Sequence, residues 1–422
     1  MQGRIKQIIQ TDFFKNVATL ISGTTLAQII ALLIYPILSR IYTPEEHGLF
    51  ALYMSIISIT GIMATGRYEP AILMPKERNK AIDLSSISML LALIFSIFLF
   101  FLVFFFRDTF GRWLKNDEIV KWLWFVPLST ILIAFFQVST YWSNRNKRFN
   151  NTAIGNVTQS FINSGVKLSA SKTIPSGGGL ITGAIAGQIA GGLYFLFRWF
   201  KKDRADILRR RGTKLKTARE YGLFPKFNLT NNLINNISNN LPIFLLSSFF
   251  GAAEVGFFGL GFTVIFRPMN LVVTSIEQVF AQRIIEKYNQ KKEIWKDIRM
   301  LIKKSIQIGF IPFLLAGIFG PIIFKFVFGP DWEEAGRYMQ ILIPWLFSAF
   351  IANQLAFLPN MFSRQRKAMW ISIIRFILRL AGMAIGIHYH NIYLTLGLFS
   401  LVSLVTVIYI ISWYISMARK YE

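Results

Sequence analysis

Six basic residues lie inside long apolar stretches of the sequence, where charge is costly. They are Arg67, Lys167, Arg267, Lys325, Arg375 and Arg379. A cation at the centre of a membrane-spanning helix costs roughly 2.5–3.5 kcal/mol on insertion scales, so these side chains should face a bundle interior or water and not lipid. The main acids at similar depth are Glu69 and Glu277. The interior of such a bundle would therefore be net positive.

Guanidinium groups at these positions favour an anion as ligand. Arginine stays protonated, and its planar fork matches phosphate oxygens in a bidentate manner. Arg375 and Arg379 are one helical turn apart and should project from the same face. We therefore expect a cationic cavity, suited to a phosphate or pyrophosphate, lined by Arg67, Arg267, Arg375, Arg379 and Lys167.

The same residues also have structural interpretations. Arg67 and Glu69 could form an ion pair, although an i,i+2 spacing is poor for one within a helix. Arg267 precedes Pro268 and could donate to carbonyls freed by a helix break. Lys325 is expected to extend to the membrane interface. For Glu69 and Glu277 we keep two roles open, a coupling carboxylate or an ion-pair partner.

Two further patterns are polar or small. The stretch NLTNNLINNISNNLP (228–242) has seven asparagines at spacings that put amides along one helical face, which could bind sugar hydroxyls or join helices. We expect cavity lining by Asn232, Asn235, Asn236 and Asn239. Glycines at 183, 187 and 191 indicate close helix packing and not a phosphate loop, since no lysine follows in the required place.

Composition identifies the elements that must position these residues. The 422-residue chain is 53% hydrophobic and only 16% charged, and apolar runs of the roughly 20 residues that cross a bilayer recur along it. We predict an all-α polytopic membrane protein. Twelve spans are expected, at 16–41, 48–74, 81–106, 119–142, 152–171, 180–197, 228–250, 255–281, 305–328, 338–361, 369–387 and 392–417.

Some functions are disfavoured by what the sequence lacks. The chain has no cysteine, which excludes disulfides and thiolate chemistry, and its three histidines lack the spacing of a metal site, so no metal is expected. No paired carboxylates lie within one span and no Ser/His/Asp set is evident, so we do not expect an enzyme. The net charge of +25 does not indicate nucleic acid, because the basic residues gather in alternate loops.

That charge asymmetry predicts the orientation. Loops on the side of the N-terminus, with the chain ends, carry 33 Lys and Arg, whereas loops on the opposite side carry 7. The positive-inside rule then places both termini in the cytoplasm. The basic, amphipathic N-terminal segment is predicted to be an interfacial helix and not a cleaved signal.

The chain is expected to consist of two similar halves. Residues 44–50 align with 252–258 at an offset of 208, which also places Glu69 on Glu277. We predict six-helix lobes at 1–200 and 221–422, joined by a basic cytoplasmic linker at 201–220. Two pseudo-symmetric bundles of parallel orientation could rock about a central cavity and open it to either side alternately, as transporters do.

Several motifs resemble a known family. RIYTPEEHGLFALY, GRYEPAILMP, FRPMN with QVFAQR, and GPDWEEAGRYMQILIPWL are similar, in order, to landmarks of bacterial O-antigen and capsule flippases of the Wzx type. These are polysaccharide biosynthesis proteins of the multidrug/oligosaccharidyl-lipid/polysaccharide (MOP) exporter superfamily, with a MATE-like fold. Arg67 and Glu69 match the GRYE motif, Arg267 matches the arginine before proline, and Arg375 and Arg379 match basic positions of the eleventh helix.

The resemblance implies movement of an undecaprenyl-pyrophosphate-linked oligosaccharide across the bacterial inner membrane, with membrane lipid and other assembly proteins (a polymerase and a chain-length regulator) as partners. No cofactor is expected, and H⁺, Na⁺ or the membrane potential could drive the cycle. Relatives that flip the peptidoglycan precursor often have two further helices. An ion-coupled multidrug exporter is the alternative within the fold, and a polysaccharide assembly enzyme is the alternative outside it.

Overall fold

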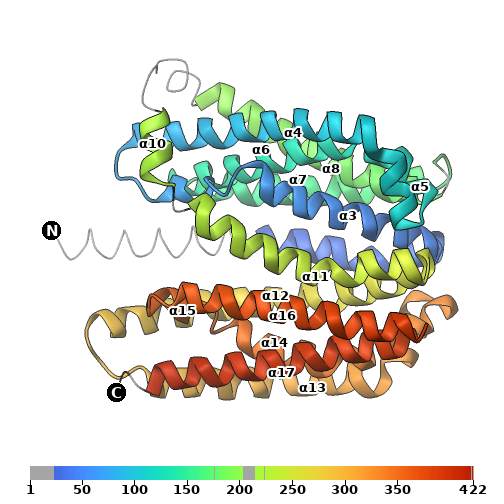
Figure 1. Ribbon diagram of the computed structural model, residues 1–422. Coiled ribbons are helices and arrows are strands. Elements are labelled where there is room, and N and C mark those ends of the chain that lie inside the picture. The colour runs from blue at the N-terminus through green and yellow to red at the C-terminus, as the bar shows by residue number, and fades with distance from the viewer. Residues whose placement is uncertain (1–22, 175, 203–213, 223, 420, 422) are drawn as a thin grey trace. The chain divides into compact units, whose positions relative to one another are not determined.

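The computed structural model describes residues 23–174, 176–202, 214–222, 224–419 and 421, and within them the ordered backbone is helical, with no β-strand. The chain divides into two compact units, Met1–Asn236 and Ile237–Glu422 (Figure 1). The prediction of an all-helical protein is confirmed for the described residues.

The described part of unit 1 begins with a helical segment at Gly23. Its elements are α2 (Tyr35–Ile41), α3 (Pro44–Ala64), η1 (Pro70–Leu73), α4 (Arg78–Leu114), α5 (Asp117–Leu123), α6 (Val126–Arg145), α7 (Phe149–Ala170), α8 (Gly178–Lys202), α10 (Lys214–Glu220), the π-helical η2 (Phe224–Leu229) and the first part of α11 (Thr230–Phe249). Unit 2 takes the rest of α11. It continues with α12 (Ala252–Asn289), α13 (Trp295–Phe328), η3 (Pro330–Trp332), α14 (Glu333–Asn353), α15 (Leu358–Met361), α16 (Gln365–His388) and α17 (Ile392–Arg419).

The described helices fit a multi-pass membrane protein. Nine are long and apolar enough to span a membrane, and α5 with α6, bent by 54°, would make a tenth. The other two expected spans are present as α7 and α11, helices of 22 and 20 residues that are rich in polar side chains. Along α4, Phe98, Phe101 and Phe105 are more than half exposed. A surface of this kind is suited to lipid and not to water.

The two halves begin alike and then diverge. Helices α3 and α12 start at Pro44 and Ala252, in agreement with the sequence offset. Thr43 and Glu46 form a capping box at the start of α3. Helix α3 ends at Ala64, whereas α12 runs unbroken for 38 residues to Asn289. The expected continuous span 48–74 is therefore wrong beyond Ala64.

The break after α3 has a local cause. Gly66 and Arg67 both take the left-handed conformation with φ of 58°, and Pro70 then opens the short 3₁₀ helix η1. Left-handed backbone does not continue a right-handed helix, and proline lacks the amide hydrogen that a continuing helix needs. The GRYE motif is thus a turn and not part of a span.

In unit 2, the helix ends that the charge pattern predicts to be cytoplasmic are joined by an apolar cluster. Ile284 of α12, Ile298 of α13, Leu358 of α15 and Trp413 of α17 are all buried there. Helices α12 and α13 extend beyond the predicted spans to reach it. Because burial of these side chains removes apolar area from water, the cluster fixes the base from which α16 begins.

Candidate functional site

The GRYE turn forms a compact ion-pair site. Arg67 donates from Nη1 to Glu69 Oε1 at 3.0 Å, and Glu69 is fully buried while Arg67 is 20% exposed. Thr65 donates its hydroxyl to the second carboxylate oxygen at 2.5 Å. The non-helical backbone at Gly66 and Arg67 brings the two charges together. In a continuous helix, residues two positions apart would not face each other. The Arg67 Nε is buried and has no hydrogen-bond partner among the described residues.

Helix α10 covers this turn. The Tyr68 hydroxyl donates to the carbonyl of Ala218 at 3.1 Å, and Thr217 donates to the buried carboxylate of Asp83 at 3.1 Å. At the rim, Lys80 and Glu220 pair at 2.9 Å. The segment before α11 is therefore attached to the motif by polar contacts as well as by apolar packing.

Lys167 lies in unit 1 but far from Arg67. Its Nζ is 4.1 Å from the centroid of the Phe50 ring, and only 6% of the residue is exposed. Phe50 is near the start of α3 and Arg67 follows its end, so about 20 Å of helix separates them. Lys167 and Arg67 therefore cannot contact one pyrophosphate together in this structure.

The surroundings of Lys167 depend on close helix packing. Tyr42, between α2 and α3, donates its hydroxyl to the Lys167 carbonyl at 2.6 Å, and burial raises the pKa of Tyr42 to about 12. In α8, a Cβ added at Gly183 would lie 2.4 Å from Cγ of Lys167, and one at Gly187 would lie 2.7 Å from the carbonyl oxygen of Gln159. The prediction that these glycines serve close packing is confirmed.

The asparagines of α11 do not act as one ladder. Asn232 and Asn235 each donate to the carbonyl and side-chain oxygens of the residue four positions earlier. Asn236 accepts from the Ser58 hydroxyl of α3 at 3.1 Å. Asn239 accepts from Arg379 Nη1 at 3.1 Å. The α11 amides thus combine contacts within the helix with contacts to other elements.

Arg379 of α16 is the most deeply enclosed of the predicted cations, with 1% of its surface exposed. Its Nε donates to Ser403 Oγ at 2.7 Å and its Nη1 to Ser238 Oγ at 2.9 Å. The guanidinium carbon is 4.9 Å from the Trp345 ring centroid and 4.7 Å from that of Phe399. Within the described chain no carboxylate pairs with it, so hydroxyl and amide dipoles and ring faces compensate the charge.

The remaining predicted residues lie on α12 and α16. Arg375 is half-buried one turn before Arg379, as the spacing predicted. Arg267 is half-buried in the middle of α12, beside Phe266, whose ring stacks on Phe262 at 4.8 Å. Glu277 is on the helical backbone of α12, and its side chain lies outside the described part of the structure.

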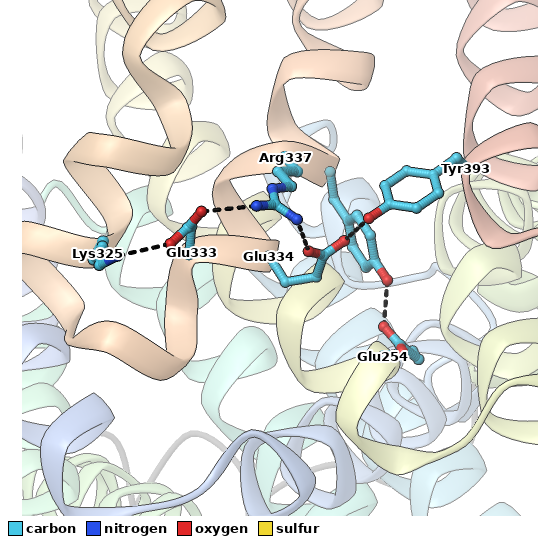
Figure 2. Close-up of polar contacts among 7 residues, drawn as sticks. Glu254, Lys325, Glu333, Glu334, Arg337 and Tyr393 are labelled. Carbon is cyan, nitrogen blue, oxygen red and sulfur yellow. Dashed lines mark hydrogen bonds and ion pairs between the residues drawn. The ribbon is translucent and has the colours of Figure 1, made fainter.

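A second polar cluster in unit 2, here called the outer cluster, lies at the helix ends opposite the apolar cluster of Ile284 and Trp413 (Figure 2). Glu333 accepts from Lys325 at 3.0 Å and from Arg337 at 2.8 Å. Glu334 accepts from Arg337 at 3.2 Å and from the Tyr393 hydroxyl at 2.5 Å. Both glutamates are in the first turn of α14, where the helix dipole favours negative charge.

The outer cluster continues inward through one buried contact. Tyr338 is 1% exposed and donates its hydroxyl to Glu254, which is in the first turn of α12. Tyr338 also packs edge-on against Tyr393, with ring centroids 6.0 Å apart. Four helices, α12, α13, α14 and α17, are joined in this way at one end of the unit.

Sequence reasoning missed the neutral groups around the cations. These are Thr65 at the GRYE turn, and Ser238, Ser403, Trp345 and Phe399 around Arg379. The available signal was weak: Thr65 directly precedes GRYE, and Ser238 interrupts the asparagine run. Ser403 and the two aromatic residues resemble many others in apolar helices.

Comparison with known proteins decides the family. The model of a family described as "Polysaccharide biosynthesis protein" matches residues 37–337, which is more than half of the chain. The chain belongs to the polysaccharide biosynthesis protein family. The family resemblance drawn from the motifs is thereby confirmed. No curated protein sequence matches it.

Solved structures show that this polysaccharide biosynthesis protein has the fold of MOP-superfamily transporters. An inward-facing MATE family multidrug resistance transporter matches with a TM-score of 0.69 at 17% identity, covering 95% of this chain and 96% of that one. The lipid II flippase MurJ, in an inward closed conformation, matches with a TM-score of 0.71 at 14% identity, covering 93% and 87%. A MOP-superfamily transporter from Pyrococcus furiosus matches with a TM-score of 0.61 at 14% identity, covering 96% of both chains.

These neighbours bear out the predicted fold of a MOP-superfamily transporter, and with the family match they agree with the expectation that the chain is not an enzyme. At such low identity the structural likeness establishes the fold alone. Since one fold hosts different cargoes, the cargo must be argued from the residues of this chain.

Proposed function

We propose that this protein translocates an undecaprenyl-pyrophosphate-linked oligosaccharide, an O-antigen or capsule/exopolysaccharide repeat unit, from the cytoplasmic to the outer leaflet of the bacterial inner membrane. Membership of a polysaccharide biosynthesis family supports the glycan. One structural neighbour is a lipid II flippase, which supports a lipid-linked cargo. Both termini would be cytoplasmic, and the polymerase and chain-length regulator of the assembly pathway would be its partners.

The proposal depends most on the surroundings of the Arg379 guanidinium. It is enclosed among hydroxyl, amide and aromatic groups without a carboxylate from the described residues. Arginine remains protonated in such surroundings, so unit 2 keeps a fixed positive charge in its interior. A positive interior favours a pyrophosphate and disfavours a cationic drug, because the effective dielectric constant there is low.

We assign different parts to the basic residues. Arg379 is closed off by its neighbours, so it acts as a positioning residue that sets the charge and orients Asn239. Arg67 has a buried, unpartnered Nε and a partly exposed side chain, which supports direct contact with the cargo. Arg267, Arg375 and Lys167 remain further candidates for the arginine-lined cavity of an alternating-access cycle, and the α11 amides remain candidates for sugar contacts.

The energy source is a further part of the proposal, and H⁺ and Na⁺ are both candidates. Glu69 is a buried carboxylate whose partners, Thr65 and Arg67, are both donors, so its protonation would release Arg67. Substitution Glu69→Gln keeps an acceptor for Thr65 and removes the titratable group. If Glu69 couples the cycle to an ion gradient, this variant should transport at the same slow rate with and without the gradient. Retained stimulation by the gradient would assign coupling elsewhere.

The test is translocation by purified protein in sealed proteoliposomes containing an undecaprenyl-pyrophosphate-linked oligosaccharide. Wild type, Arg67→Ala and Arg267→Ala are compared, with Lys296→Ala on the exposed part of α13 as a charge-matched control. We expect wild type and the control to move the glycan and both arginine variants to slow by about tenfold or more, since each removes a charge-assisted contact. Equal glycan transfer with and without protein, across several glycans, would overturn the proposal.

A further inference from the structure

A basic pocket lies at the turn between α15 and α16, and none of its lining residues is assigned to the cargo. Its volume is about 450 Å³, and it is lined by Ser363, Arg364, Arg366, Lys367 and Trp370. These five residues are called the turn pocket below. Three of the five are cations, and none is acidic. The turn belongs to a loop that the charge asymmetry predicts to be cytoplasmic.

The backbone of the turn pocket is fixed by its own hydrogen bonds. Ser363 takes the left-handed conformation with φ of 53°, and its amide donates to the Asn360 carbonyl at 3.2 Å. The amide of Arg364 donates to the Pro359 carbonyl at 2.7 Å. A non-glycine residue in this conformation has to be held by its surroundings. The two arginines therefore start from a defined backbone and not from a loose loop.

The cations of the turn pocket are exposed and lack acidic partners among the described residues. Arg364, Arg366 and Lys367 are all exposed, and no ion pair is found for any of them in the part of the chain described. Lys367 instead points its Nζ toward aromatic rings of α17, 5.0 Å from the centroid of Trp413 and 6.0 Å from that of Tyr409. Two guanidinium forks and an ammonium group together match the oxygens of a phosphate diester.

An apolar surface continues from the turn pocket along the span. Trp370, Ile374 and Ile377 of α16 are 52%, 53% and 56% exposed, and their spacing of four and three places them on one helical face. Tyr409 of α17 is 52% exposed beside Lys367. Tryptophan and tyrosine prefer the membrane–water interface, so the cations would lie at headgroup level and the isoleucines at acyl-chain level. Such an arrangement fits an amphiphile better than a free anion.

We propose that the turn pocket binds an anionic glycerophospholipid of the cytoplasmic leaflet. Its phosphate contacts Arg364, Arg366 and Lys367, and its acyl chains lie along the face of Trp370, Ile374 and Ile377. Basic pockets next to membrane helices on the cytoplasmic side are suited to such headgroups, and each basic side chain near the surface contributes about 1 kcal/mol to their attraction. None of the five pocket residues is among those assigned to the cargo, and lipid bound there would make the protein respond to the lipid composition of its membrane.

The test measures lipid retention by the full chain in detergent, by native mass spectrometry. The lipids are phosphatidylglycerol, its zwitterionic counterpart phosphatidylcholine, and undecaprenyl pyrophosphate, and inorganic phosphate is added as a competitor. The variant is Arg364→Gln/Arg366→Gln/Lys367→Gln. The control is Lys296→Gln/Arg299→Gln/Lys303→Gln, which removes the same charge from exposed positions on α13.

We expect wild type and the control to prefer phosphatidylglycerol over phosphatidylcholine, and the turn-pocket variant to lose affinity for phosphatidylglycerol by about tenfold or more. Equal loss in the control would show a general effect of charge and overturn the site. Displacement of the lipid by inorganic phosphate at similar concentration would show a free-anion site. Stronger retention of undecaprenyl pyrophosphate at this pocket would make it a cargo site. Either result contradicts the proposal.

A second measurement on wild type keeps the inference testable if the triple variant does not fold. Phosphatidylglycerol with brominated acyl chains should quench Trp370, because bromine quenches indoles that it touches. The difference in quenching between wild type and Trp370→Phe gives the contribution of Trp370. This contribution should disappear in high salt, because salt screens the contact with the headgroup. Quenching of Trp370 that is equal for brominated phosphatidylcholine would contradict an anionic site.

Discussion

At the scale of single residues, Arg379 shows how a cation is kept inside an apolar bundle. Ser403, Ser238 and Asn239 accept its hydrogen bonds, and the rings of Trp345 and Phe399 lie against it. Buried charges of this kind contribute little or nothing to stability, because desolvation offsets the gain from the contacts. If Arg379 adds little to the stability of the fold, its charge is available for the proposed anionic cargo.

Substitution Arg379→Met tests this interpretation. Replacing a buried charge by an apolar side chain of similar length is often neutral or stabilising, so Tm in detergent should stay within about 2 °C of wild type or rise. Glycan translocation should nevertheless fall by about tenfold or more, since the interior loses its fixed charge. Thermal unfolding and transport are measured on the same preparation. Normal transport by this variant would show that the charge of Arg379 is not needed for the cargo.

The matched prediction concerns the partner of Arg379. Substitution Ser403→Ala leaves the charge in place and removes the acceptor of its Nε, so it should destabilise the protein by about 1–3 kcal/mol. Tm should therefore fall more in Ser403→Ala than in Arg379→Met. The reverse order would mean that the guanidinium itself supports the packing of unit 2.

Arg67 and Glu69 can be separated in a similar way. Arg67→Met leaves a fully buried carboxylate without its cation and should cost about 3–5 kcal/mol. Adding Glu69→Gln should restore most of the stability, because the Thr65 hydrogen bond can persist. If Arg67 contacts the cargo, the stable double variant still fails to transport. Recovered transport would show that the pair is only structural.

At the scale of elements, α7 and α8 approach so closely that glycine is required at defined positions. A Cβ at Gly187 would lie 2.7 Å from the backbone oxygen of Gln159, whereas one at Gly192 in the same helix would lie 3.6 Å from a leucine side chain. The backbone next to Gly187 cannot move aside for a methyl group, whereas the contact at Gly192 is an ordinary van der Waals distance. Alanine substitutions at the two positions can therefore be compared as a matched pair.

We therefore expect Gly187→Ala to lower stability by about 1–3 kcal/mol through overpacking. Gly192→Ala should be neutral or gain up to about 1 kcal/mol, because alanine is the better helix former. Both are compared by thermal unfolding in detergent. Equal Tm values for the two variants would contradict the close approach of α7 and α8.

The outer cluster offers another matched pair. Tyr338 is buried and donates to Glu254, whereas Tyr393 is 44% exposed and donates to Glu334. Tyr338→Phe leaves a partly buried carboxylate without its donor and should cost about 1–3 kcal/mol. Tyr393→Phe should cost less than about 1 kcal/mol, since water replaces the lost contact. A larger loss of stability for Tyr393→Phe than for Tyr338→Phe would show that the exposed contact of the cluster stabilises the protein more than the buried one.

The elements also show which features could be predicted from sequence. Long apolar runs predicted helices such as α4 and α17. A single chain segment in lipid can satisfy its backbone hydrogen bonds only as a helix. The turn at GRYE was missed because Gly66 and Arg67 adopt a left-handed backbone that composition does not reveal. The Arg67–Glu69 pair was judged by helical geometry for that reason. Contacts between distant residues, such as Arg379 with Ser238 and Ser403, depend on packing that a single sequence does not encode locally.

At the scale of the whole molecule, the fold is shared with a multidrug transporter and with a lipid II flippase. One fold can thus host different cargoes. The two functions considered for this chain, translocation of a pyrophosphate-linked glycan and export of a cationic drug, call for opposite signs of charge in its interior. Basic residues outnumber acids at span depth in the sequence, and the described cations include one held by neutral groups alone. This balance favours the anionic, lipid-linked cargo.

The most direct measurement compares three cargoes in the same sealed proteoliposomes. They are an oligosaccharide linked to undecaprenyl pyrophosphate, the same oligosaccharide on an uncharged lipid, and a cationic fluorescent drug. If the interior recognises pyrophosphate, wild type moves the first cargo, moves the second far more slowly and leaves the third in place, and Arg379→Met removes the difference between the first two. Export of the cationic drug without movement of the pyrophosphate-linked glycan would contradict the account.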